Sequence, residues 1–485
     1  MNKLIILFCI CFFFLDIISQ WQPDVRLTNN IWDSGTTYNN ARCVTVNGNI
    51  IHLVFLDNRD GNYEIYYKRS TDAGISWGPD TRLTNNSAPS LFFSVAVSGS
   101  IVHIVWQDQR VTNDQIYYKR SSDNGVSWGP DSRLTNTSTL TVTPSIAVSG
   151  NFVHVVWDDF RDINPEIYYK GSSDAGISWG TDTRLTNNSS NSLYPSTAVS
   201  GNIVHVVWHD ERDGNYEIYY KRSSDGGISW GADTRLTNAA GFSWYSSASV
   251  SGSLVNVVWE DNRNGNYEIY YKHSTDGGIS WDADSRLTNS SGNSWRPSAA
   301  SSGSAVHVLW HDNRDGNYEI YYKRTTDGGI SWDADSRLTN SSGVSNYPCP
   351  ITSDSVVHVF WTDNRDGNGE IYYKRDPTGN PIGIQTISTE IPHNFSLSQN
   401  YPNPFNPVTK IRFSIPASLS FGERRGVRLL IYDLHGREVA TLVNEQLKPG
   451  TYEAEWNAAN YSSGVYFYSL ITEGFTSTKK MILVK

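Results

Sequence analysis

The fold is decided by the stretch Trp208-His-Asp-Glu-Arg-Asp-Gly-Asn-Tyr-Glu-Ile-Tyr-Tyr-Lys-Arg-Ser-Ser-Asp-Gly-Gly-Ile-Ser-Trp-Gly-Ala-Asp-Thr-Arg-Leu-Thr237, because close copies of it recur along the chain. Its Asp-x-Arg element returns every 51 residues, with the aspartate at Asp57, Asp108, Asp159, Asp210, Asp261, Asp312 and Asp363. We number the repeats one to seven in the order of these aspartates. A period of this length is typical of propellers and other repeat folds.

Each repeat reads as four short strands separated by Ser-Gly, Asp-Gly-Asn and Asp-Gly-Gly turns. In repeat four, the strands are expected at Thr197–Ser200, Ile203–Trp208, Glu217–Lys221 and Trp230–Thr237. Four strands in about 40–50 residues is the spacing of a propeller blade. The sequence therefore predicts an all-β chain with a propeller over residues 20–380.

The two ends of the repeat region complement each other. The last repeat stops after a third strand at Glu370–Arg375, whereas Trp21–Asn30 has the sequence of a fourth strand without three strands before it. Pairing these two segments would leave no open sheet edge. We predict a seven-bladed β-propeller closed by the N-terminal strand.

A second element, Ser/Thr-x-Asp-x-Gly-x-Ser-Trp, follows the third strand in six repeats, with its aspartate at Asp72, Asp123, Asp174, Asp225, Asp276 and Asp327. It resembles the Asp-box, or BNR repeat, of sialidase-type propellers, and the resemblance covers about residues 21–380. The resemblance implies that these aspartates are structural. The carboxylate and the Ser or Thr hydroxyl can accept turn N–H groups, and Gly permits a positive φ.

The resemblance also raises the possibility of a sialidase, a glycosidase with an arginine triad, a Tyr/Glu nucleophile pair and an Asp acid/base. This chain departs from that pattern, because its Arg residues are nearly all periodic, no Arg-Ile-Pro segment occurs near the N-terminus, and seven repeats exceed the six blades of sialidases. A catalytic centre needs one asymmetric cluster of groups. We assign no catalytic residue and keep an exo-sialidase-like glycoside hydrolase as an alternative.

The first residues and the charge bear on location and partners. Residues 1–19 place Lys3 before an apolar run, which is typical of a signal peptide. No later segment approaches eighteen apolar residues, so we expect no transmembrane segment in the mature chain. The net charge is −10, and residues 394–485 carry ten Lys and Arg against seven Asp and Glu. The repeats are therefore acidic, which argues against nucleic acid as a partner.

The C-terminal region contains motifs that differ from the repeats: Phe395-Ser-Leu-Ser-Gln-Asn-Tyr-Pro-Asn-Pro-Phe-Asn-Pro407, Leu430-Ile-Tyr-Asp-Leu-His-Gly-Arg-Glu-Val439, Gly464-Val-Tyr-Phe-Tyr468 and Lys479-Lys-Met-Ile-Leu-Val-Lys485. They resemble the type A sorting domain of the type IX secretion system of Bacteroidota. The resemblance implies a small Ig-like β-sandwich over residues 394–485, after a linker at 381–393. It also implies the type IX secretion machinery as a partner, and a secreted or outer-membrane cell-surface location reached through the periplasm.

Aromatic residues that do not follow the period mark a candidate binding face. Three tryptophans lie in the connections between repeats, where the repeats differ most, and aromatic rings beside Asp, Arg and Asn suit carbohydrates. The predicted ligand-binding residues on this loop face are Trp32, Tyr38, Phe92, Tyr194, Trp244, Tyr245, Trp295, Arg296 and Tyr347. The alternative is that these side chains only cover the ends of the blades.

Periodic polar residues are interpreted as scaffold. The Asp-x-Arg pairs are expected to form salt bridges within or between blades. A histidine of the second strand recurs in six repeats and is replaced by Asn256 in repeat five, which preserves hydrogen bonding and not metal ligation. We therefore expect no metal and no cofactor.

Cys43 and Cys349 both occupy the start of the first strand, in repeats one and seven. Ring closure makes these repeats neighbours, so a disulfide is predicted there; it would close a very long loop of the unfolded chain. The alternative is a pair of buried free thiols.

Three functions are compatible with the sequence. The first is a secreted or cell-surface binding module for carbohydrate or a surface polymer. The second is a sialidase-like glycoside hydrolase, and the third is a structural or adhesive spacer.

Overall fold

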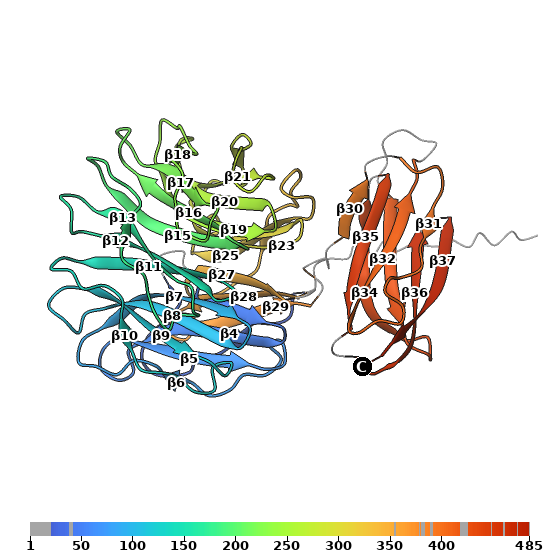
Figure 1. Cartoon of the computed structure of the whole chain (residues 1–485), viewed down its shortest axis with the longest axis horizontal. Helices are drawn as coiled ribbons and strands as arrows, with labels where there is room; N and C mark the ends of the chain where they lie inside the picture. Colours follow the sequence, from blue (N-terminus) through green and yellow to red (C-terminus); the bar gives the residue numbers. More distant parts are fainter. Residues whose placement is uncertain are drawn as a thin grey trace, which may run out of the picture.

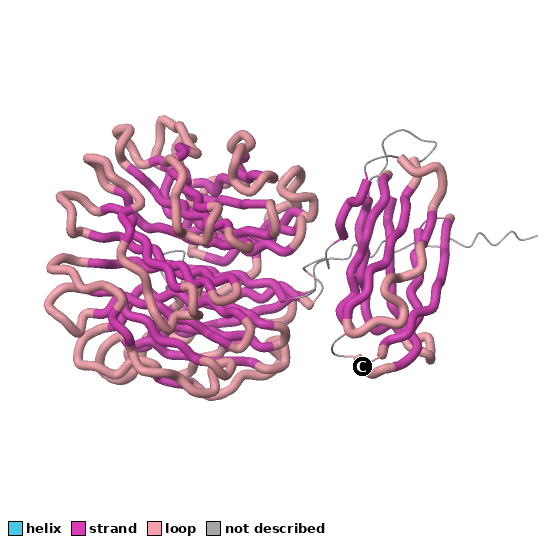
Figure 2. The backbone as a smooth tube through the Cα atoms, in the orientation of Figure 1, coloured by secondary structure: helices cyan, strands magenta, loops and turns pink. Residues whose placement is uncertain are grey.

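The computed structural model describes residues 21–37, 42–353, 356–377, 379, 384–388, 391–417, 425–447, 449–458, 461–472 and 474–484. Every regular element among them is a β-strand, which confirms the all-β prediction (Figure 2). Figure 1 shows two bodies, the first made of the strands before β30 and the second of β30 to β37. The predicted signal peptide at 1–19 and Tyr38 lie outside the described residues.

Repeat four illustrates the unit of the first body. Its strands β15 (Ser192–Ser200), β16 (Ile203–Asp210), β17 (Glu217–Ser223) and β18 (Thr234–Arg235) form one antiparallel sheet in chain order. The fourth strand is shorter than predicted. Its segment is bound to β17 at both ends, because the Gly231 N–H donates to the Arg222 carbonyl at 3.0 Å and the Leu236 N–H to the Ile218 carbonyl at 2.8 Å.

Repeats two, three, five and six have the same order, whereas in repeat one both β2 and β3 pair with β4. The strands before β30 form seven sheets within the described residues. Their bounds are β2 (Ser34–Gly35), β3 (Val44–Asn47), β4 (Ile50–Asp57), β5 (Glu64–Ser70) and β6 (Thr81–Arg82) in repeat one; β7 (Ser90–Ser98), β8 (Ile101–Asp108), β9 (Gln115–Ser121) and β10 (Ser132–Arg133) in repeat two; β11 (Thr141–Ser149), β12 (Phe152–Asp159), β13 (Glu166–Ser172) and β14 (Thr183–Arg184) in repeat three; β19 (Ser243–Ser251), β20 (Leu254–Asp261), β21 (Glu268–Ser274) and β22 (Ser285–Arg286) in repeat five; β23 (Ser294–Ser302), β24 (Ala305–Asp312), β25 (Glu319–Thr325) and β26 (Ser336–Arg337) in repeat six; β27 (Ser345–Ser353), β28 (Val356–Asp363) and β29 (Glu370–Asp376) in repeat seven.

The sheet of repeat seven takes its fourth strand from the other end of the chain. β1 (Val25–Arg26) pairs antiparallel with β29, with Val25 opposite Tyr373 and Arg26 opposite Tyr372. The first strands of successive sheets contact one another from β3 through β7, β11, β15, β19 and β23 to β27, and β27 contacts β3. The contacts between sheets therefore return to their starting point.

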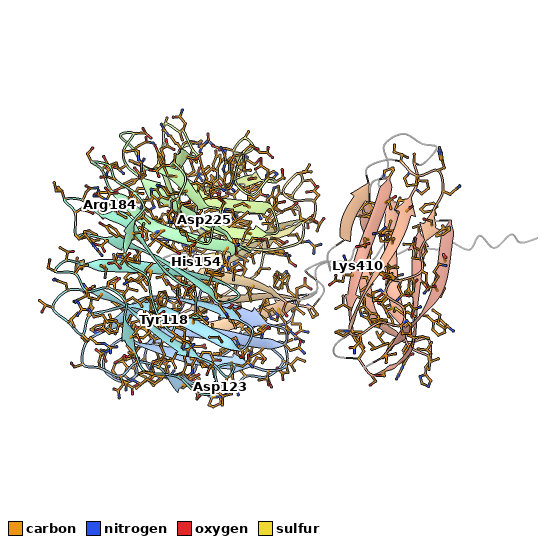
Figure 3. The ribbon with its side chains drawn as sticks, viewed as in Figure 1. Tyr118, Asp123, His154, Arg184, Asp225 and Lys410 are labelled. Atoms are coloured by element: carbon orange, nitrogen blue, oxygen red, sulfur yellow. The ribbon has the colours of Figure 1, made fainter. Side chains whose placement is uncertain are left out.

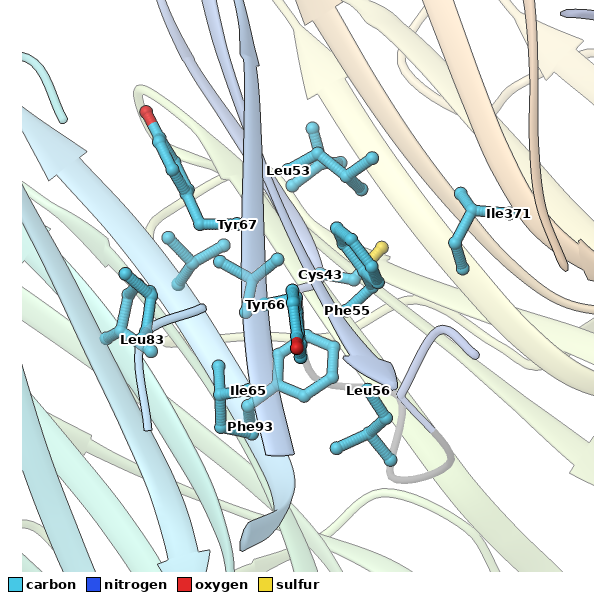
Figure 4. Packing of buried hydrophobic residues seen from close by; sticks show 14 of the residues in the cluster. Cys43, Leu53, Phe55, Leu56, Ile65, Tyr66, Tyr67, Leu83, Phe93 and Ile371 are labelled. Atoms are coloured by element: carbon cyan, nitrogen blue, oxygen red, sulfur yellow. The ribbon is translucent and has the colours of Figure 1, made fainter. Parts of the chain in front are cut away.

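The core lies between neighbouring sheets. Val207 and Tyr220 of repeat four pack with Val257 and Trp259 of repeat five, and all four side chains are buried. Fully burying one large apolar side chain contributes about 1.5–3 kcal/mol, so a constant set of such residues in every repeat explains why the sheets are nearly identical. Figure 4 shows the corresponding cluster of repeat one, in which Ile371 of repeat seven also takes part.

The second body consists of two four-stranded antiparallel sheets that share one apolar core, which includes Ile411, Leu429, Trp456 and Tyr468. The strands are β30 (Ile384–Ser388), β31 (Ser396–Leu397), β32 (Val408–Ile415) and β35 (Gly450–Asn457) in one sheet, and β33 (Arg425–Tyr432), β34 (Glu438–Leu447), β36 (Gly464–Thr472) and β37 (Phe475–Leu483) in the other. Part of the predicted linker at 381–393 is thus a strand, because β30 pairs antiparallel with β35.

Candidate functional site

The loop face of the first body carries a row of strained residues. Six non-glycine residues at equivalent positions have φ between 41° and 54°: Phe92, Thr143, Tyr194, Tyr245, Arg296 and Tyr347. Each follows the point where the first strand of its sheet shifts register against the second. Such backbone costs about 1–3 kcal/mol per residue and is held only where surrounding contacts impose it.

For five of these six residues, the backbone N–H donates to a side chain of the preceding sheet: Thr143, Tyr194, Tyr245, Arg296 and Tyr347. The Tyr194 N–H donates to Asp158 Oδ1 at 2.9 Å, and the Arg296 N–H donates to Glu260 Oε2 at 2.8 Å. The acceptor is always the residue between Trp and Asp of the Trp-x-Asp element, which differs from repeat to repeat: Gln107, Asp158, His209, Glu260 and His311. The same hydrogen bond therefore recurs between neighbouring sheets, while the side chains of both the donor residue and the acceptor residue vary.

Repeats four to seven bring the ionisable and aromatic members of this row together. We call the following residues the central cluster: Tyr194, His209, Tyr245, Glu260, Arg296, His311 and Tyr347. The ring centroids of Tyr194 and Tyr245 are 4.9 Å apart, and the His209 ring is 5.3 Å from the first and 5.6 Å from the second. The Arg296 guanidinium lies over the Tyr245 ring at 3.3 Å from its centroid.

Burial shifts the pKa values of several groups in the central cluster. Burial, and next the Arg296 guanidinium, lowers the pKa of His209 and of His311 to about 3, so both imidazoles are neutral at pH 7. Burial also raises the pKa of Glu260 and, with Tyr245 nearby, raises that of Tyr194 to about 12. The Arg296 guanidinium therefore lies near two neutral imidazoles and interacts with the Glu260 carboxyl, and a guanidinium in such surroundings can bind an anionic group.

The predicted ligand residues divide into several groups. Tyr194, Tyr245, Arg296 and Tyr347 belong to the central cluster. Trp244 and Trp295 lie beside it and pack on loop tyrosines, with centroid distances of 5.2 Å from Trp244 to Tyr216 and 5.6 Å from Trp295 to Tyr318. Phe92 takes the equivalent position in repeat two, outside the cluster. Trp32 is 52% exposed in the connection before repeat one.

The buried members His209, Glu260 and His311 are absent from the residues predicted from the sequence. A signal for them exists in the sequence, since the middle residue of Trp-x-Asp is the one position of that element that changes in every repeat from two to six.

The Asp-box turns lie at the opposite ends of the strands. β16 ends and β17 begins beside the loop face, so the turn after β17 is at the far end of the sheet. There Asp225 Oδ1 accepts the N–H groups of Ile228 and Ser229 at 3.1 and 2.9 Å, and the hydrogen bonds from Ser229 lower the pKa of Asp225 to about 2. Asp123 and Asp225 are labelled in Figure 3. These contacts are local to the turn.

The other periodic polar residues bond within the sheets. Arg212 contacts Asp210 at 2.6 Å and Asp233 at 2.7 Å. His205 Nδ1 and the Tyr220 hydroxyl are 2.8 Å apart, and Asn256 in repeat five accepts the equivalent bond from Tyr271 at 2.7 Å. The substitution of His by Asn thus preserves the bond. Among the described residues, no group of three or more His, Cys, Asp or Glu could hold a metal ion.

Cys43 and Cys349 lie side by side and are buried. The Cys43 N–H donates to Cys349 Sγ at 3.1 Å, and both thiols are free. Burial raises the pKa of the Cys43 thiol.

Comparison with known proteins identifies the second body. Residues 399–485 match the family model described as the secretion system C-terminal sorting domain. This region is a sorting domain. It confirms the resemblance of the C-terminal motifs, and it indicates export out of the cell or to its surface. Within the described part of the chain, no helix is long and apolar enough to cross a membrane.

No curated protein matches the chain. Among solved structures, the polysaccharide lyase Uly1 matches with a TM-score of 0.52 and 8% identity, over 73% of this chain and 99% of the lyase. The endosialidase of phage phi92 matches with a TM-score of 0.48 and 11% identity, over 88% and 80%. A sialidase of Trypanosoma rangeli matches with a TM-score of 0.43 and 12% identity, over 84% and 89%. The first of these similarities shows a shared fold.

Proposed function

We propose that the sheets of residues 21–377 are the blades of a closed seven-bladed propeller, followed by an Ig-like sandwich that directs export through the type IX machinery. The pairing of β1 with β29 and the contact between β27 and β3 support the closure. The match of residues 399–485 to the sorting domain supports the route.

The function that the geometry supports best is extracellular binding of an acidic carbohydrate by the central cluster. The observation that carries this proposal is Arg296, a guanidinium stacked on Tyr245 in a row where the other repeats hold aromatic or hydroxyl side chains. A carboxylate can bond a guanidinium through two oxygens, and the faces of Tyr194 and Tyr347 suit the apolar faces of sugar rings.

A second candidate function is cleavage of a uronate-containing glycan by β-elimination, which the Tyr194–Tyr245 pair favours. A phenolate oxygen of one tyrosine would take the proton next to the carboxylate, the C–O bond to the leaving sugar would break as a C=C bond forms, and the neutral phenol of the other tyrosine would donate a proton to the leaving oxygen. Hydrolysis is less favoured, since the buried carboxylates Asp158 and Glu260 belong to sheets separated by that of repeat four and each accepts a backbone N–H.

The test is calorimetric titration of the full mature chain with neutral and uronate-containing oligosaccharides, together with assays for unsaturated products and for release from a fluorogenic sialoside. We expect the uronate-containing ligands to bind more tightly than neutral ligands of the same length, and only this difference to depend on Arg296. The variant Arg296→Tyr, which takes the residue of repeats four, five and seven at this position, is expected to weaken binding by about 10-fold or more.

The matched control is Phe92→Tyr, at the same backbone position outside the central cluster, which should bind like the wild type. Equal binding of the two variants would contradict the proposal for Arg296. If no oligosaccharide binds and none is cleaved, the remaining interpretation is a structural spacer.

A further inference from the structure

The contact region between repeats seven and one is called the seam. It lacks the large side chains that repeat six has at the equivalent positions. Repeat six has Trp295, His311 and Tyr318 at three positions that lie close together, and their rings contact each other, with 5.6 Å between the centroids of Trp295 and Tyr318 and 5.1 Å between those of His311 and Tyr318. Repeat seven has Asn346, Thr362 and Gly369 at these positions. All three replacements are smaller than the residues of repeat six.

A pocket of about 220 Å³ occupies this place. It is called the seam pocket here, and its lining residues are Asp33, Ser34, Gly35, Leu56, Tyr63, Val344, Asn346, Thr362, Asn364 and Gly369. Pockets for drug-sized ligands measure about 300–1,000 Å³, so the seam pocket has room for one sugar ring. It opens on the loop face, where Asn346 directly precedes Tyr347 of the central cluster.

The walls of the seam pocket are held in place by hydrogen bonds. Asp33 Oδ1 accepts the Gly369 N–H at 2.8 Å, and Asn364 Oδ1 accepts the Val344 N–H at 2.5 Å. A Cβ at position 369 would lie only 3.2 Å from the Ser34 carbonyl oxygen, so Gly369 permits the close approach of the N-terminal segment. The pocket therefore exists before any ligand binds.

One polar atom in the wall of the seam pocket has no hydrogen-bond partner within the described residues. Asn346 Oδ1 is buried and has no hydrogen-bond partner. A buried acceptor without a donor costs about 1–3 kcal/mol, and such groups are expected to have an external partner. Tyr63 adds an aromatic wall, and burial, together with the Asp33 carboxylate, raises its pKa above the ordinary value, so this phenol stays neutral.

We propose that the seam pocket binds one neutral monosaccharide unit, with Tyr63 against the ring and a sugar hydroxyl donating to Asn346 Oδ1 after the half-buried Asn346 amide turns toward the ligand. The Asp33 carboxylate accepts hydroxyl donors and repels anions, so this subsite prefers a neutral sugar, in contrast to the central cluster. The proposal rests on the proposed carbohydrate specificity of the loop face, but it does not depend on Arg296.

The test is saturation-transfer NMR of the full mature chain with methyl glycosides of glucose, galactose, mannose, rhamnose and N-acetylglucosamine. At least one is expected to receive saturation. The variant Asn346→Trp introduces the residue of repeats five and six, fills the pocket and should abolish the signal. If that variant does not fold, Asn346→Leu, the residue of repeats two and four, removes the acceptor and should reduce affinity by about 10-fold.

Arg296→Tyr separates this proposal from the proposed function, because it should leave the methyl glycoside signal unchanged. Saturation that is equal in wild type and Asn346→Trp would overturn the seam pocket. The seam pocket would also be overturned if no methyl glycoside binds while uronate binding depends on Arg296. In that case the proposed function would stand.

Discussion

At the scale of single residues, one buried position changes its chemical group from repeat to repeat, although the residues on both sides of it are constant. The middle residue of Trp-x-Asp is buried in repeats two to six, yet it is amide, carboxyl, imidazole, carboxyl and imidazole in turn. Each of these groups accepts the N–H of a strained residue in the next sheet, so chemical identity can change while the backbone geometry is kept. The central cluster arises from this tolerance.

Asp158 makes a testable contribution to stability. Burial raises its pKa to about 8, from an ordinary value near 4 in the unfolded chain. Between about pH 4 and pH 8 the unfolded chain loses this proton while the folded protein keeps it. The free energy of unfolding should therefore fall as pH rises through that window, by at most about 1.4 kcal/mol per pH unit. Asp158→Asn should remove this fall.

Asparagine is a suitable replacement because it can still accept the Tyr194 N–H, and it can donate to the Thr143 hydroxyl that now bonds Asp158 at 2.5 Å. Thermal unfolding of both proteins from pH 4 to 8 gives the measurement. The melting temperature of Asp158→Asn should exceed that of the wild type by a margin that grows with pH. A constant margin would contradict the expected titration.

At the scale of the strand, the first residue of each third strand joins the sheet to the connection that follows. Glu217 is fully buried and accepts bonds from Arg235 at 2.9 Å, the Thr237 hydroxyl at 2.5 Å and the Ala239 N–H at 2.8 Å. Repeat two carries Gln115 instead, which still accepts a backbone N–H, that of Thr137, at 3.0 Å. A neutral acceptor of the same shape is therefore compatible with the sheet.

We expect Glu217→Ala to destabilise the protein by about 3–5 kcal/mol, because it removes the acceptor of the Thr237 hydroxyl and of the Ala239 N–H and one of the two carboxylates that Arg235 contacts. Glu217→Gln should cost less than half of that value. Urea unfolding of the two variants beside the wild type provides the comparison. Equal losses would mean that the charge of Glu217, and not its shape, determines the stability of this corner.

The strands also show which parts of the fold are readable from sequence. The predicted segments Ile203–Trp208 and Glu217–Lys221 agree with β16 and β17 to within two residues, because their alternation is uninterrupted. The first strand begins five residues before the predicted Thr197, since the register shift at Tyr194 reverses the alternation. The same local shift hides the central cluster, whose buried members come from the neighbouring sheet.

At the scale of the whole molecule, the two cysteines lie where repeats one and seven meet. We predict that the protein isolated from an oxidising compartment contains a Cys43–Cys349 disulfide, formed by exchange with a disulfide such as oxidised glutathione, which leaves as two thiols. The bond would stabilise the protein by about 2–4 kcal/mol. Thiol titration of the mature chain in denaturant should find no free thiol before reduction and two after it.

A Cys349→Ser variant is the control, because it should show one thiol before and after reduction and melt at the temperature of the reduced wild type. Two titratable thiols in the oxidised wild type would rule out the disulfide. Repeats one and seven would then be joined by the pairing of β1 with β29 and by the contact between β27 and β3, without a covalent bond.

The pairing of β1 with β29 has a consequence for biosynthesis. Arg26 and its partner Glu370 are 344 residues apart, so a ribosome releases the first strand long before its neighbour exists. In the nascent chain, β1 stays without its partner strand until repeat seven has been synthesised. The C-terminal sorting domain is translated after that. A chain that terminates before repeat seven therefore lacks both the partner strand of β1 and the sorting domain.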